Sequence, residues 1–238
     1  MAIRTTGIVV ALASEARTLT SHTVKPDDIT ALTDGAALWL SGMGPVAARR
    51  GAQALADAGA AALAVFGVAG ALSAHLHNGA LFCPERVVDE DGHAYAADLA
   101  WRASLQQRLA ASLHMEGALL SVASPLLTPA DKASAHQHCA ALAVDMESAA
   151  VAAVARERGL PFVVLRAIVD EARDAIPTAL NDSVDAWGRP RPLHLMAALC
   201  RHPSVLGELP RLYSRMQRAT QALRAAAEAT GPTLGWHR

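Results

Sequence analysis

Short apolar runs alternate with segments of helical character along most of the chain. Runs rich in Val, Ile, Leu, Ala and Phe predict buried strands at 8–12, 36–40, 62–66 and 162–169, with weaker strands near 81, 87–88, 119–123 and 142–144. Helices are predicted between them, at 46–58, 97–113, 129–138 and 146–158. This alternation predicts an α/β fold in which helices cover both faces of a central sheet. Ligands of such sheets bind beyond the strand ends, so candidate chemistry should follow the strands.

Residues with special backbone preferences mark several helix ends. Pro45 suits the first position of a helix, and Thr128 suits the N-cap of the helix that follows it. Gly159, followed closely by Pro161, is expected to end the helix before it. No low-complexity linker separates these elements, so we expect a single domain over residues 1–238.

The C-terminal part, about 189–238, is predicted to be helical and is rich in arginine. Seven arginines and no lysine lie from Arg189 to Arg224, with Glu208 as the one acidic residue, and two helices are expected on either side of Pro203. An ordinary amphipathic helix packed on the sheet, with its arginines in water, explains the pattern. The sharper alternative is a basic surface that rests on anionic lipid.

Composition restricts the class of protein. Hydrophobic residues make up 52% of the 238 residues and charged residues 18%, which argues against disorder. A net charge of -1 gives no reason to expect nucleic acid as a partner. The three cysteines are far apart and form no CxxC pair, which argues against a disulfide framework and a zinc site. No apolar run suits a signal peptide or a membrane span, so we expect a cytoplasmic protein.

Three candidate segments follow predicted strands. Glu15 comes shortly after the first strand, where a carboxylate could reach a site at the sheet edge or could simply favour the helix dipole. Residues 41–45 (SGMGP) and 67–70 (GVAG) follow the next two strong strands. Bare N–H groups at a helix start can hold a phosphate or a water, although tight turns explain these glycines equally well. Neither segment has a dinucleotide-binding or phosphate-loop fingerprint.

A fourth feature is a pair of segments, 145–150 (DMESAA) and 166–170 (RAIVD). The first lies where a strand becomes a helix, and the second ends the strongest predicted strand. Taken alone, Asp145 and Glu147 could serve only the helix start, and Asp170 could simply open a loop.

Together, however, these two segments resemble the paired signature of the nucleoside phosphorylase/nucleosidase superfamily, in particular of methylthioadenosine/adenosylhomocysteine nucleosidases. Residues 41–48 (SGMGPVAA) resemble the SG(I/M)GxVxA segment of those enzymes, 67–70 fall where they have GSAG, and Glu15 falls where they have a catalytic glutamate. The resemblance implies a three-layer αβα fold with a central mixed sheet, phosphorylase/hydrolase-like. It also implies an enzyme that cleaves the N-glycosidic bond of a purine nucleoside.

The remaining third resembles one branch of that superfamily. Residues 84–92 (PERVVDEDG), the Thr128-Pro129 loop and the Arg/Pro-rich tail resemble the hopanoid-associated phosphorylases, thought to remove adenine from adenosylhopane in bacterial hopanoid synthesis. The family resemblance implies a homodimer. The chemistry needs no metal and no cofactor, apart from phosphate as co-substrate if the reaction is phosphorolytic. A lipid nucleoside would make peripheral contact with the inner membrane surface useful.

The resemblance implies roles for single residues. Asp170 takes the place of the acid that protonates purine N7, a task that requires a carboxyl group holding a proton near neutral pH. Glu147 takes the place of the residue that binds the ribose 2′- and 3′-hydroxyls, because a carboxylate can accept both hydrogen bonds. Met146 would pack against the sugar or serve the core alone. The other expected substrate contacts are Val68, Gly70, Leu126 and Leu127.

Whether the nucleophile is water or phosphate is left open. Phosphorylases of this superfamily use a Gly-Asp-Pro-x-Arg segment near the first strand, and Glu15 stands there instead. A carboxylate repels phosphate but can accept a proton from water, which slightly favours hydrolysis. Val68 replaces the Ser of GSAG, which counts against hydrolysis. The residues expected around the nucleophile are Gly42, Gly44 and Arg166.

Two other functions remain open. The first is a nucleosidase that acts on soluble methylthioadenosine or adenosylhomocysteine. The second is a nucleoside-binding protein on the same fold that has lost catalysis, although the presence of both Glu147 and Asp170 speaks against it. Adenine release from several 5′-substituted adenosines would discriminate among all of these functions.

Overall fold

The structure is a computed structural model of the chain. It describes residues 5–109, 113–177, 183–191, 194, 201 and 205–237.

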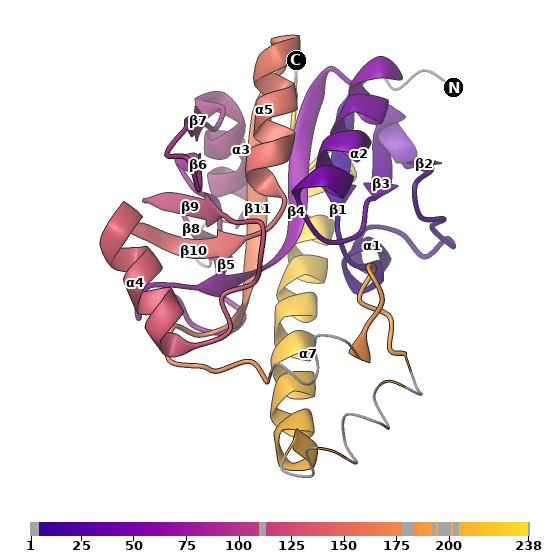
Figure 1. Cartoon of the computed structure of the whole chain (residues 1–238). Coiled ribbons are helices and arrows are strands. Elements are labelled where there is room, and N and C mark those ends of the chain that lie inside the picture. The colour runs from indigo at the N-terminus through magenta and orange to yellow at the C-terminus, as the bar shows by residue number, and fades with distance from the viewer. Residues whose placement is uncertain are drawn as a thin grey trace.

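The described residues form an 11-stranded mixed sheet at the centre of the molecule (Figure 1). Eight strands lie in the order β2-β3-β1-β4-β10-β9-β6-β7, while β11 pairs with β4 and β5, and β5 pairs with β8. The strands are β1 (Thr6–Val10), β2 (Ile29–Ala31), β3 (Ala37–Leu40), β4 (Ala62–Ala71), β5 (Leu81–Phe82), β6 (Arg86–Asp89), β7 (Ala94–Ala96), β8 (Leu113–His114), β9 (Ala118–Ser121), β10 (Ala141–Asp145) and β11 (Phe162–Asp170).

Helices cover both faces of this sheet. On one face α2 (Pro45–Asp57) packs against α5 (Ser148–Arg158), and on the other α7 (Val205–Thr230) packs against α1 (Ala13–Leu19) and α3 (Leu99–Leu109). A further helix, α4 (Pro129–Cys139), lies beside β10, and a short 3-10 turn, η1, spans Thr33–Gly35. The predicted three-layer αβα fold with a central mixed sheet is confirmed.

Alternation along the central strands divides the core between the two faces. In β1, Val9 belongs to the cluster under α2 and α5, whereas Ile8 and Val10 belong to the cluster under α1, α3 and α7. Successive side chains of a strand point to opposite faces, so a strand covered on both faces reads as a continuous apolar run. This is why the strongest strands were visible in the sequence.

Local signals placed several helix ends correctly. Pro45 is the first residue of α2, and the Thr128 hydroxyl caps α4 by accepting a hydrogen bond from the N–H of Asp131 at 3.1 Å. Gly159 adopts the left-handed conformation that ends α5. Each signal acts within a few residues of the end that it marks.

The prediction that residues 67–70 form a loop after a short strand is wrong. They belong to β4, which continues to Ala71 and pairs with β11 from Leu63 to Gly70. The ladder supplies partners for the backbone of this glycine-containing segment, and tertiary pairing overrides the weak local preference for a strand.

Other predicted elements differ in extent or were missed. The predicted helix 97–113 spans Leu99–Leu109, and β2, β7 and β8 had no counterpart among the predictions. The missed strands have two or three residues each, and apolar alternation over so few residues is too brief to detect. The first of the two predicted C-terminal helices lies largely outside the described residues, and the second corresponds to α7.

Strand β4 brings the two signature segments together. Gly70 in β4 is paired on one side with Val144 of β10 and on the other with Asp170 of β11. Arg166 is paired with Gly67 in the same ladder. Segments about 20 residues apart in sequence therefore end on either side of one glycine, because the sheet order inserts β4 between β10 and β11.

Helix α7 changes character along its length. Its C-terminal half packs into the core through residues that include Ala219 and Leu223, whereas Leu206 and Tyr213 are exposed in the N-terminal half, which extends beyond the sheet (Figure 1). The part of the chain that the structure describes contains no helix whose apolar stretch could span a lipid bilayer.

Candidate active site

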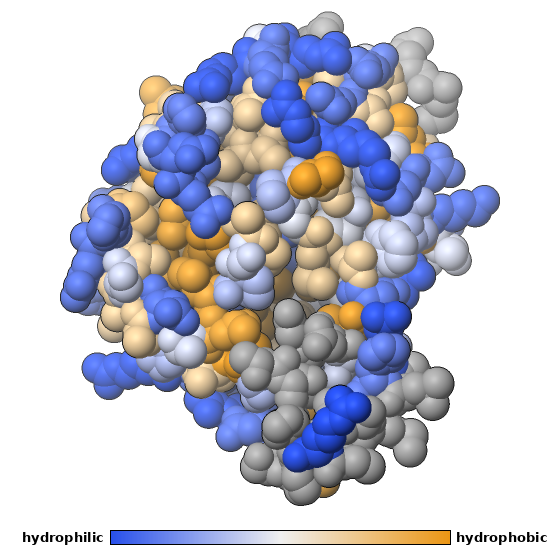
Figure 2. Space-filling view, viewed as in Figure 1, coloured by the Kyte–Doolittle hydropathy of each residue, from blue (hydrophilic) through white to orange (hydrophobic). Residues whose placement is uncertain are grey.

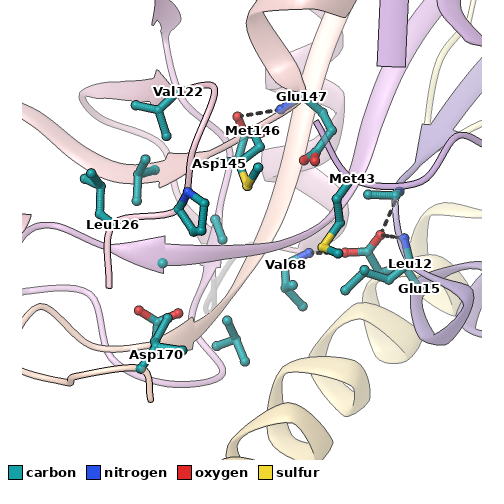
Figure 3. A pocket seen from close by; sticks show the side chains of 17 residues that line it. Leu12, Glu15, Met43, Val68, Val122, Leu126, Asp145, Met146, Glu147 and Asp170 are labelled. Atoms are coloured by element: carbon teal, nitrogen blue, oxygen red, sulfur yellow. Dashed lines mark hydrogen bonds between the residues drawn. The ribbon is translucent and has the colours of Figure 1, made fainter. Parts of the chain in front are cut away.

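A cavity of about 220 Å³ lies where β4, β10 and β11 meet the β1–α1 turn. Seventeen described residues line it, and Figure 3 shows their side chains. Asp170 stands at one end with Leu126 and Val122 above it, and Glu15 stands at the other end (Figure 3). Glu147 and Met146 approach from the upper side. In Figure 2, hydrophobic residues gather toward the left of centre on the face that bears this region.

Glu15 lies in the first turn of α1, and its side chain is buried. One carboxylate oxygen accepts hydrogen bonds from the N–H groups of Ala11 (3.0 Å) and Leu12 (2.8 Å), and the other accepts one from Val68 (2.8 Å). Burial raises the pKa of Glu15 to about 7, although the Arg166 guanidinium and the N–H donors act to lower it. The residue therefore supports the helix start and can also exchange a proton near neutral pH.

Close approach to this carboxylate explains the glycine at position 67. A Cβ atom there would overlap the Glu15 carboxylate and the Arg166 guanidinium. Gly67 is therefore needed because the charged groups of Glu15 and Arg166 lie directly against strand β4, and not because the chain turns there.

Arg166 is the buried cation beside Asp145 and Glu147, with a side chain that is 1% exposed. Its Nε donates to Oδ2 of Asp145 at 2.9 Å, and one of its terminal nitrogens donates to the same oxygen and to Oε2 of Glu147 at 3.1 Å. Asp145 also accepts a hydrogen bond from the N–H of Ser148 at 3.2 Å. Asp145 thus serves the start of α5 and neutralises Arg166 at the same time.

Arg166 and the three carboxyl groups around it shift one another's pKa values. Burial by itself would lower the pKa of Arg166, but Asp145, Glu147 and Glu15 raise it above its ordinary value. Burial raises the pKa of Glu147, and Arg166 opposes that rise. Three carboxyl groups surround one guanidinium, so the cluster has no positive charge left for a further anion.

Glu147 has hydrogen-bonding capacity left for a ligand. Its Oε1 accepts the N–H of Gly44 at 3.0 Å, and its Oε2 accepts Arg166. A carboxylate has about four acceptor sites, so each oxygen could still accept a hydroxyl group. The Gly44 N–H, which we expect near the nucleophile, donates to this side chain.

Two further predicted residues lie beside the cavity without lining it. Gly42 adopts a positive φ of 85° and packs under the carbonyl of Ala186 and the indole of Trp187. Leu127 accepts a hydrogen bond through its carbonyl from the N–H of Ile176 at 2.9 Å. The other predicted contacts, Val68, Gly70, Leu126 and Met146, all line the cavity.

Asp170 has a partner that the sequence pattern did not indicate. Its carboxylate packs against Gly70, where a Cβ atom would lie 3.0 Å from Oδ2, and Lys132 of α4 donates a hydrogen bond to that same oxygen. The Lys132 side chain is 1% exposed. A single lysine in a polar helix is usually solvent-exposed, so only tertiary contacts reveal this ion pair.

The described residues include one group whose spacing could suit a metal ion. Asp89, Asp91 and His93 lie together on the β6–β7 hairpin, away from the cavity. The Asp89 carboxylate accepts hydrogen bonds from the N–H groups of both Asp91 and His93. These hydrogen bonds stabilise the turn between β6 and β7, so the turn alone explains why the three residues lie together.

Comparison with known proteins agrees with this geometry. The sequence pattern described as the phosphorylase superfamily matches residues 6–199. No curated protein matches the chain in sequence.

Several solved structures share the fold. The methylthioadenosine/adenosylhomocysteine nucleosidase of S. pneumoniae superposes with a TM-score of 0.67 at 20% identity, covering 95% of this chain and 100% of that one. The Helicobacter pylori nucleosidase of the same type gives 0.65 at 17% identity, covering 84% and 100%. The futalosine hydrolase of Helicobacter pylori gives 0.65 at 18% identity, covering 94% and 97%.

Proposed function

Because the chain belongs to the phosphorylase superfamily, we propose that it hydrolyses the N-glycosidic bond of a 5′-substituted adenosine and releases adenine. The family membership confirms the predicted enzyme class, cleavage of N-glycosyl bonds. One observation carries the choice of water as the nucleophile. The described residues that line the cavity include four acidic side chains and no basic one. A phosphate dianion would be repelled there, whereas water can give a proton to Glu15.

The proposed reaction assigns one task to each end of the cavity. Adenine lies near Asp170, where N7 receives a proton so that the base leaves as a neutral molecule. The ribose lies below Glu147, which binds the 2′- and 3′-hydroxyls and stabilises the positive charge that develops on the sugar. Glu15 takes the proton of the attacking water. No metal or cofactor has a task in this scheme.

The end of the cavity near Glu15 suits an apolar 5′ substituent. Leu12, Met43 and Val68 lie there (Figure 3). We therefore propose that the substrate is adenosylhopane and that the enzyme acts in hopanoid synthesis. Methylthioadenosine or adenosylhomocysteine is the second candidate substrate, since similar structures carry that activity in their names. A non-catalytic nucleoside-binding protein is the alternative of another class.

The decisive experiment measures adenine release in phosphate-free buffer and again with added phosphate. Its substrates are adenosylhopane, methylthioadenosine, adenosylhomocysteine and adenosine. We expect a free ribosyl product at the same rate in both buffers, with adenosylhopane cleaved fastest. Strict dependence on phosphate, with a ribose 1-phosphate product, would establish phosphorolysis instead. Binding without any release of adenine would support the non-catalytic alternative.

Replacing Glu147 by Gln should weaken ribose binding and charge stabilisation together. We expect kcat/KM to fall by roughly a hundredfold, because an ionised hydrogen-bond acceptor near the developing cation is lost. A 2′-deoxy substrate should be penalised less in this variant than in the wild type. Glu157→Gln is the matched control, since Glu157 is exposed and pairs with Arg49 on the surface. Equal 2′-deoxy penalties in the variant and the wild type would remove Glu147 from the ribose role.

Two associations complete the proposal. Val46 is 84% exposed and Met43 38% exposed at the start of α2, and we propose that this apolar surface contributes to a homodimer. The exposed Leu206 and Tyr213 of α7 support peripheral contact of a cytoplasmic enzyme with the inner membrane surface. Sedimentation equilibrium tests the first association, and cosedimentation with anionic vesicles tests the second. A monomer, or no vesicle binding at low salt, would contradict them.

A further inference from the structure

We propose that the Lys132–Asp170 ion pair, rather than a lone carboxylic acid, delivers the proton to purine N7. This inference rests on the proposed function and assigns Lys132 as a positioning residue and proton reserve behind the base site. Asp170 lines the cavity, where the proposed function places the base, whereas Lys132 does not line it and acts through Asp170.

The Lys132 ammonium group donates hydrogen bonds to three acceptors. Its Nζ donates to Oδ2 of Asp170 and to the carbonyl oxygens of Glu171 at 3.0 Å and Asp174 at 3.1 Å. An ammonium group has three N–H donors, so each donor has one acceptor. The ion pair therefore holds the Asp170 carboxylate in one orientation and also ties down the chain that follows β11.

A purely structural role would not require a lysine here. Lys132 is the one buried residue of α4. Taking an ammonium group out of water costs several kcal/mol even when it is paired, and a well-packed apolar residue often serves as well or better. A buried charge placed against the residue that faces the base thus points to a chemical task.

Neighbouring charged groups are bound elsewhere. β4 contributes only uncharged residues, 68–71, to the surroundings of the pair. On the other elements, Asp131 is hydrogen-bonded to Thr128, and Glu171 interacts with Asn78 and His77. Asp174 forms ion pairs with Arg211 and Arg215. Arg166 forms ion pairs with Asp145 and Glu147 and also interacts electrostatically with Glu15.

The proton balance of the step is complete. As the C1′–N9 bond breaks, its electron pair goes to the base, the Lys132 ammonium passes a proton to Oδ2 of the ionised Asp170, and the Asp170 carboxyl group passes that proton on to N7. Water adds its oxygen to C1′ and gives its proton to Glu15. Solvent then removes the proton from Glu15 and returns one to the Lys132 amine, so the enzyme regains its starting state.

This arrangement predicts a particular pH profile. The Lys132 ammonium carries the proton that replaces the one given to N7. Without Lys132, Asp170 must take this proton from solvent, which supplies fewer protons as the pH rises. Removing Lys132 should move the alkaline limb of kcat/KM to lower pH.

The test compares pH profiles of adenine release for the wild type, Lys132→Met, Lys132→Gln, Lys132→Arg and Asp170→Asn. We expect the alkaline limb to move down by at least about one pH unit in the Met and Gln variants, with a loss of roughly a hundredfold above pH 8. The Arg variant retains the charge but cannot give up a proton, so it should lose the high-pH activity as the Met and Gln variants do. Asp170→Asn should lose roughly a hundredfold or more at every pH. Lys25→Met is the matched control, because Lys25 is exposed and is the only other lysine in the chain.

The outcomes separate this inference from the function on which it rests. A wild-type alkaline limb in Lys132→Gln or Lys132→Met, whatever the rate, would overturn the inference and leave Lys132 as a structural residue. Circular dichroism identifies the variants that fold, and Lys132→Gln is retained because it keeps a hydrogen-bond donor. A wild-type enzyme that releases no adenine from any of the substrates would contradict the proposed function itself.

Discussion

Replacing Glu15 by Gln should abolish measurable adenine release in phosphate-free buffer, with a loss on the order of a thousandfold or more, within the range for a removed general base. The amide cannot take the proton of the attacking water. It also presents an N–H group where the backbone of Ala11, Leu12 and Val68 already donates. The measurement is kcat/KM for adenine release, with the exposed Glu116 replaced by Gln as the matched control. A near-wild-type rate in Glu15→Gln would remove the residue from catalysis.

The same residue should set the acidic limb of the wild-type profile. A general base must be ionised, and the pKa of Glu15 is about 7, so activity should fall as pH drops through about 7. The contribution of Glu15 to the free energy of unfolding changes with pH in the opposite direction. The folded state binds more protons than the unfolded state between pH 4.5 and about 7, so this group's contribution to the free energy of unfolding falls as pH rises through that window. The slope is at most about 1.4 kcal/mol per pH unit.

Replacing Arg166 by Met should lower the free energy of unfolding by about 3–5 kcal/mol, the cost of leaving buried charges without a partner. Arg166 is the cation bound to both Asp145 and Glu147, and both of these carboxyl groups are buried. The measurement is urea unfolding at pH 8. The deficit should shrink as the pH falls, because burial raises the pKa of Glu147 and the variant lacks the guanidinium that opposes this rise.

An exposed arginine gives the control for this prediction. Arg158 pairs with Asp57 on the surface, with side chains 45% and 61% exposed. Arg158→Met should therefore change the free energy of unfolding by no more than about 1 kcal/mol. Equal effects of Arg158→Met and Arg166→Met would show that the buried cluster does not need its cation.

Much of the site could be predicted from sequence through the superfamily resemblance. Glu15, Glu147 and Asp170 all line one cavity, as the order of their segments implied. The purely local explanations also hold for two residues, since Glu15 and Asp145 accept hydrogen bonds from N–H groups at helix starts. One carboxylate can serve a helix end and a site together, so local pattern could not choose between these roles.

By itself, the sequence determined the strands and helices whose signals are local. Apolar runs such as 162–169 become strands buried on both faces, and the Thr128 cap and Gly159 act within a few residues of the helix ends. Tertiary structure decided what depends on partners distant in the chain. Pairing with β11 extends β4 through the glycines that resemble a turn, and packing of α4 places Lys132 against Asp170, 38 residues away. The spacing of apolar residues shows which face of a helix or strand is buried. It does not show which group pairs with a buried charge, because that depends on which elements the fold places side by side.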